Sequence, residues 1–72
     1  MIKKNKIKIQ LNGKKSILKA GSSVKDLILK LDIPLNKVAI ELNEIILDKK
    51  KIKNTILKKN DKIEIVHFIG GG

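Results

Sequence analysis

The chain has 72 residues, carries seventeen basic and seven acidic side chains with a formal net charge of +10, and contains no cysteine. This length allows one small domain, which buries only about 60% of the surface that its unfolded chain exposes. Because cysteine is absent, a disulfide framework and a thiolate zinc site are both excluded, and stability must come from aliphatic packing.

The positive charge raises the possibility of a nucleic-acid partner, since lysines near phosphates release counterions. All of the basic residues are lysine, however, whereas recognition of bases and phosphates draws heavily on the bidentate arginine fork. The single aromatic residue, Phe68, is too little for a platform on which bases stack. These features argue against nucleic acid as the partner.

The amino-terminal stretch alternates isoleucine with lysine and lacks a continuous apolar run, so we do not expect a signal peptide. No stretch of the chain is long and apolar enough to span a bilayer. The expected location is the cytoplasm, without membrane attachment.

Residues 6–11 alternate isoleucine or leucine with lysine or glutamine, the period of two that is typical of a half-buried strand. Asn12 and Gly13 follow, and this pair favours a type I′ turn because both central positions need positive φ. The chain then returns through residues 14–19. We therefore predict an antiparallel hairpin over residues 6–19.

A helix is predicted to begin after Ser23, because Asp26 stands three residues on in a variant of the capping box. Pro34 disfavours helical geometry at the preceding residue, so the helix should stop near Asp32. One apolar stripe at helical spacing is expected to face the core: Val24, Leu27, Ile28 and Leu31.

Residues 38–42 form the predicted third strand, followed by a turn at 43–44 and a short fourth strand at 45–47. Residues 48–59 are predicted to be mostly loop, with three apolar residues as isolated anchors into the core: Ile52, Ile56 and Leu57. Asn60 and Asp61 form a turn before the last strand, residues 62–68.

On the last strand Ile63 and Ile65 should point inward, which places Val66 and Phe68 on the opposite face. An exposed aromatic residue is a candidate interface anchor. The alternative is that Phe68 covers an edge of its own core.

The chain ends in three glycines, Gly70, Gly71 and Gly72, which have no side chains to pack and should project from the fold. A frayed terminus is the structural alternative for such residues. The abrupt change from an apolar strand to residues that present only backbone and a terminal carboxylate favours a functional tail. We predict a folded domain over residues 1–69 and a flexible tail over residues 70–72.

No self-contained active site is evident in the sequence. His67 is the only histidine and has no partner for a ligand pair or a catalytic triad, and the seven acids are scattered. Neither a phosphate-binding glycine loop nor a nucleophile elbow is present. We therefore expect neither a bound metal nor a stably bound cofactor, and no enzyme activity.

The order of hairpin, helix and further strands is typical of an α+β protein of the β-grasp class, with a mixed sheet of four to five strands packed on one main helix. The segments at 38–43 and 61–72, together with Asn12-Gly13 and the helix entry at 21–24, resemble the ThiS family, the ubiquitin-like sulfur carriers of bacterial thiamine biosynthesis. Asn43-Glu44 stands where Asn-Gly is frequent in that family, so a shifted turn is expected there.

The resemblance implies that the Gly72 carboxylate is adenylated by an ATP-dependent, ThiF-type adenylyltransferase and converted to a thiocarboxylate by a sulfur donor enzyme. A ThiG-type thiazole synthase would then use the sulfur. Gly70 and Gly71 would thread the partner's channel, and a monomer is expected for a carrier that visits two partners. The residues expected to face these partners are Ala39, Val66, Phe68 and Ile69.

Two alternatives remain open. One keeps the fold and changes the pathway, as a sulfur-donating subunit like the small subunit of molybdopterin synthase. The other, from a different class, is a small basic nucleic-acid-binding domain, which requires steeply salt-dependent affinity for DNA or RNA.

Overall fold

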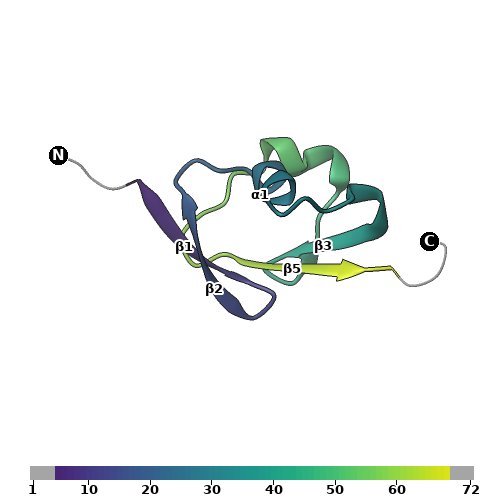
Figure 1. Ribbon diagram of the computed structural model, residues 1–72, viewed down its shortest axis with the longest axis horizontal. Helices are drawn as coiled ribbons and strands as arrows, with labels where there is room; N and C mark the ends of the chain where they lie inside the picture. Colours follow the sequence, from purple (N-terminus) through teal and green to yellow (C-terminus); the bar gives the residue numbers. More distant parts are fainter. Residues whose placement is uncertain (1–4, 69–72) are drawn as a thin grey trace.

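The amino-terminal hairpin opens the sheet in the computed structural model, which describes residues 5–68 (Figure 1). Strand β1 (Lys6–Leu11) pairs antiparallel with β2 (Lys14–Lys19). Asn12 and Gly13 have φ of 49° and 84°, as a type I′ turn requires. The predicted hairpin over residues 6–19 is confirmed.

Five strands make one mixed sheet in the order β2-β1-β5-β3-β4, which confirms the predicted α+β class. Strand β5 (Lys62–His67) lies in the middle, parallel to β1 and antiparallel to β3 (Val38–Leu42). Strand β4 (Ile45–Ile46) is a two-residue edge. The last strand in the sequence is therefore central in the sheet and held from both sides.

Helix α1 (Val24–Lys30) begins with the predicted capping box: Ser23 Oγ accepts from the Asp26 N–H, and the Asp26 carboxylate accepts from the Ser23 N–H. The helix ends at the cap residue Leu31, one residue before Asp32, which has φ of 57°. The prediction that Leu31 extends the buried stripe is wrong, because the side chain lies beyond the last helical residue and is 39% exposed. A short 3-10 turn, η1 (Leu35–Lys37), leads into β3.

The turn between β3 and β4 is not shifted, contrary to the expectation from its sequence. Leu42 pairs with Ile45, which leaves only two residues, Asn43 and Glu44, in the loop. Both have positive φ, 52° and 72°. Glu44 thus occupies the left-handed conformation that a glycine would adopt without steric cost.

Residues 48–59 contain more regular structure than the predicted loop, since a 3-10 helix, η2, spans Lys49–Asn54. Ile52 and Leu57 are buried as expected, but Ile56 is 48% exposed and is not a core anchor. Ile56 makes an isolated antiparallel bridge with Ser23. Because neighbours on an extended segment point to opposite sides, burial of Leu57 turns Ile56 toward solvent.

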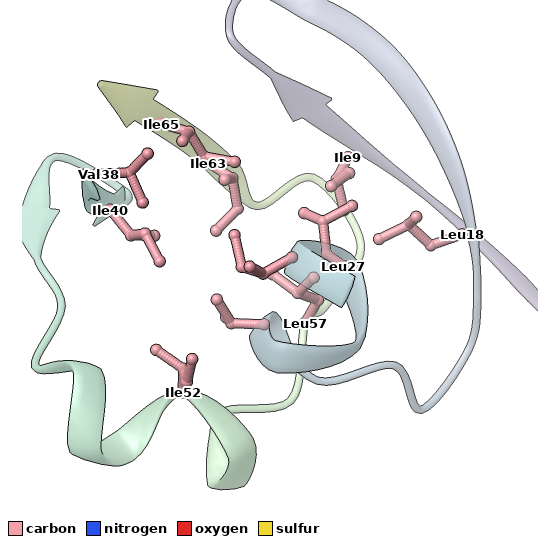
Figure 2. Packing of buried hydrophobic residues seen from close by; sticks show 11 residues of the cluster. Ile9, Leu18, Leu27, Val38, Ile40, Ile52, Leu57, Ile63 and Ile65 are labelled. Atoms are coloured by element: carbon pink, nitrogen blue, oxygen red, sulfur yellow. The ribbon is translucent and has the colours of Figure 1, made fainter. Parts of the chain in front are cut away.

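The core lies between the sheet and the layer formed by α1 and η2, as Figure 2 shows. The sheet, α1 and η2 each supply buried aliphatic side chains, and none of the buried residues is aromatic. The cluster consists of Ile9, Leu18, Val24, Leu27, Ile28, Val38, Ile40, Ile52, Leu57, Ile63 and Ile65. The face of the sheet turned away from α1, here called the outer face, is not covered by any helix within residues 5–68.

Candidate functional site

Strand β5 positions the residues of the candidate site. Ile63 and Ile65 point into the core, so Val66 lies on the outer face. Val66 and Phe68, the residue after the strand, are 50% and 49% exposed. The Phe68 N–H donates to the Lys37 carbonyl at 2.9 Å, which extends the pairing with the β3 side one residue past the strand. The chain is thus held by backbone hydrogen bonds up to the last described residue.

Asn12 ties the first turn to β5, a role that the sequence analysis did not assign to it. Its Oδ1 accepts from the Ile65 N–H at 2.7 Å, and its backbone N–H donates to the Ile63 carbonyl at 2.9 Å. Local sequence identifies Asn12 as a turn residue, but a partner 53 positions away can be found only from the fold. Asn12 therefore fixes β5 against β1 ahead of the tail.

Asn43 makes a second connection, between the β3–β4 turn and the start of β5. Its Nδ2 donates to Asp61 Oδ1 at 3.0 Å, and its Oδ1 accepts from the Lys62 N–H at 2.9 Å. The other carboxylate oxygen of Asp61 accepts from the Lys58 N–H. Two turns remote in sequence thus brace the amino end of β5.

The outer face carries two of the four residues expected to meet a partner. Ala39 is directly opposite Val66 in the β3–β5 register, and a third residue, Phe68, directly follows the end of β5. Ala39 is half-buried, so a docking surface here would be shallow. The fourth residue, Ile69, and the tail residues Gly70, Gly71 and Gly72 lie outside the described residues.

Lys49 is a neighbour of Phe68 that the sequence analysis missed. Its Nζ lies 5.3 Å from the centroid of the Phe68 ring, within cation–π range. Lys49 opens η2, a segment predicted as loop, and no local pattern connects it with residue 68. A positive charge therefore accompanies the exposed ring.

The part of the chain that the structure describes contains no cluster of side chains suited to hold a metal ion. No three His, Asp or Glu side chains among residues 5–68 are placed to hold a metal ion. His67 is exposed at the end of β5. None of the helices within these residues has the length and apolar character needed to cross a bilayer.

Comparison with known proteins gives consistent matches over nearly the whole chain. The model of the ThiS family matches residues 4–72. The sulfur carrier protein ThiS of Bacillus subtilis is 37% identical over 65 residues, covering 89% of this chain and 98% of that protein. The crystal structure of a thiamine biosynthesis protein, ThiS, from Geobacter metallireducens superimposes with a TM-score of 0.80 at 29% identity, over 92% of this chain and 100% of that chain.

A further relative is much longer than this chain. The thiazole synthase of Magnetococcus marinus is 38% identical over 66 residues, which is 92% of this chain but only 20% of that protein. The chain thus spans about a fifth of the length of this relative.

Proposed function

The chain belongs to the ThiS family, and on this basis we propose that it is a sulfur carrier of thiamine biosynthesis and not itself an enzyme. The observation that carries the proposal is the placement of β5. This strand is paired on both sides, presents Val66 and Phe68 outward, and leads directly toward the glycine tail.

In the proposed reaction the tail supplies the reacting group and the folded domain supplies the surface that the partners bind. A terminal carboxylate is ionised at neutral pH and is a poor electrophile, so it must be activated. The Gly72 carboxylate attacks the α-phosphorus of ATP on the partner, which releases diphosphate and gives an acyl-adenylate. Attack by a persulfide of the sulfur donor enzyme on the acyl carbon expels AMP and gives an acyl disulfide. A thiol then cleaves its S–S bond by forming a disulfide with the donor's sulfur, which leaves a thiocarboxylate on Gly72.

The three glycines suit entry into a narrow channel. Without Cβ atoms, Gly70 and Gly71 can pass close to channel walls and adopt backbone conformations closed to other residues. Ordering the tail costs roughly 1–2 kcal/mol per residue. Contacts of the folded domain with the partner must offset this cost, and we assign them to Ala39, Val66, Phe68 and Ile69.

We propose two successive partners, a ThiF-type adenylyltransferase and a ThiG-type thiazole synthase, with a separate sulfur donor enzyme. The thiazole synthase partner is supported by the thiazole synthase relative, which contains a region similar to most of this chain. The carrier would work as a monomer in the cytoplasm, with ATP bound by the activating enzyme and no cofactor held stably by the carrier.

The test is adenylation of altered tails by the activating enzyme of the same organism. Deleting Gly72, or appending one alanine after it, should abolish ATP-dependent formation of diphosphate. The terminal carboxylate then lies short of the α-phosphorus or beyond it. The matched control appends one alanine before Met1 and should react as the unaltered chain does. Normal activation of the extended tail would overturn the proposal.

A second readout is the intact mass of the protein purified from its own cells. A fraction that has exchanged one oxygen for sulfur, localised by fragmentation to Gly72, is the expected product. Sulfur found elsewhere in the chain would contradict the proposed chemistry.

A further inference from the structure

A basic hollow lies on the outer face at the other end of β5 from Phe68. It has a volume of about 240 Å³ and is lined by Lys8, Ile9, Gln10, Lys15, Asn60 and Lys62. Three of these six residues are lysines, and none is acidic. The hollow is separate from the residues assigned above to partner contact.

The strand register explains why the lysines converge. Gln10 pairs with Lys15 on one side and with Lys62 on the other, so the three residues form one row across β2, β1 and β5. With strands about 4.8 Å apart, the outer two Cα atoms are about 10 Å apart. Lys8 precedes Gln10 by two residues and shares its face. Three lysines therefore flank Gln10 on one face of the sheet.

The positive charge of the hollow is poorly balanced by neighbouring acids. Among residues 5–68 the single ion pair joins Lys62 Nζ to Glu44 Oε2 at 3.4 Å, and the Glu44 side chain is 80% exposed. The next acids on the same face are Glu64 and Glu41, opposite each other and farther along β5 and β3. Lys8 and Lys15 thus lack a carboxylate partner within the described part of the chain, so the hollow has unused capacity for an anion.

The chemistry of the lining favours carboxylates over a phosphate group. Phosphate sites commonly use free backbone N–H groups, but here the N–H groups of Gln10, Asn60 and Lys62 already donate to Asp61, Lys8 and Asn43. The volume is also below the roughly 300–1,000 Å³ of typical small-molecule pockets. The hollow therefore offers mainly flexible lysine ammonium groups, which can pair with acidic side chains on the surface of another protein.

The position of the hollow on β5 indicates which protein would supply the acidic side chains. Lys62 and Val66 share the outer face, where four residues of strand separate them by about 13 Å, and Phe68 directly follows the end of β5. A partner that covers Val66 and Phe68 therefore reaches the hollow within one interface of ordinary size. The geometry points to an acidic segment of the activating enzyme that docks in the hollow formed by Lys8, Lys15 and Lys62, an inference that rests on the proposed function.

The experiment measures binding of the full chain to the activating enzyme by calorimetry between 50 and 300 mM salt. The double variant Lys8→Gln and Lys15→Gln should weaken binding about three- to tenfold at low salt and flatten the salt dependence, because two partly exposed ion pairs are lost. The control is Lys25→Gln with Lys30→Gln. These lysines are exposed on α1, behind the sheet, and the control removes the same charge. It should change the affinity less than twofold.

Three outcomes would overturn the inference. Equal losses in both double variants would mean that only net charge matters. Inorganic diphosphate that binds the free chain in the hollow, seen as shifts of Lys8 and Lys15 signals by NMR, would identify a phosphate site instead. Failure of the enzyme to bind the unaltered chain would overturn the inference and the proposed partner together.

Adenylation is measured separately, as diphosphate release at saturating enzyme. Binding that depends on Lys8 and Lys15 without any adenylation would refute the proposed function and leave the docking site supported. Normal adenylation with identical affinities for all variants would support the proposed function and refute the docking site.

Discussion

Single residues with unusual backbone conformations determine how the turns of this protein are built. Asn12, Asn43 and Asn60 all adopt positive φ, which asparagine tolerates better than most residues. Two of them also use their side chains to hold β5, through Ile65 and Lys62. Glu44 also has a left-handed conformation, but its side chain forms only an exposed ion pair with Lys62 within the described residues.

Replacing Glu44 with glycine should therefore stabilise the protein. A non-glycine residue in the left-handed region costs roughly 1–2 kcal/mol, of which the greater flexibility of unfolded glycine cancels about half. The net gain expected in the free energy of unfolding is about 0.5–1 kcal/mol, measured by urea denaturation. The control, Glu44→Gln, removes the ion pair and keeps the strained backbone, so it should be nearly neutral. A destabilised glycine variant would contradict this account of the turn.

At the scale of an element, the segment from η2 to Leu57 completes the core beneath α1. It is attached by backbone hydrogen bonds, from the Val24 N–H to the Thr55 carbonyl and from the Leu57 N–H to the Ser22 carbonyl. These bonds determine which side chains of the extended residues after η2 point toward the core. They bury Leu57 and expose Ile56, although the two side chains are similar in size and apolarity.

Ile52 and Ile56 provide a matched test of which side chains in this segment reach the core. Ile52→Ala should lower the free energy of unfolding by about 2–5 kcal/mol, because it removes a side chain that is only 3% exposed. Ile56→Ala, in the same segment, should cost less than about 1 kcal/mol. Chemical denaturation of both variants checks the difference. Similar losses would mean that both side chains are core anchors after all.

Across the whole molecule, the sheet separates a stabilising face from a face left free for partners. The inner face packs on α1 and η2, and the outer face has no covering layer within the described residues (Figure 1). Val66 lies on this face toward the carboxyl end of β5, and Phe68 follows the strand with Lys49 Nζ beside its ring. Because the core is built on the inner face, the binding role that we propose for the outer face does not require it to stabilise the fold.

This division predicts that Phe68→Ala affects partner binding more than stability. Adenylation should show a Michaelis constant for the carrier raised about tenfold with little change in turnover, because a central aromatic contact is worth about 1 kcal/mol or more. The control Leu29→Ala truncates another exposed side chain on α1, in the opposite layer, and should leave the kinetics unchanged. Equal effects of the two substitutions would place the partner elsewhere.

Hydrophobic periodicity and turn chemistry in the sequence by themselves determined the hairpin, the capped helix, the strand at 38–42, the last strand to within one residue of its end, and the exposure of Val66 and Phe68. These features depend on neighbours within a few residues, so a local pattern can specify them. Only the tertiary structure decided the central place of β5, the attachment of Asn12 to Ile65, the burial of Ile52 over Ile56, the approach of Lys49 to Phe68 and the convergence of three lysines. Each of these depends on which distant segments pair and in which register, and that is decided by the packing of the whole chain.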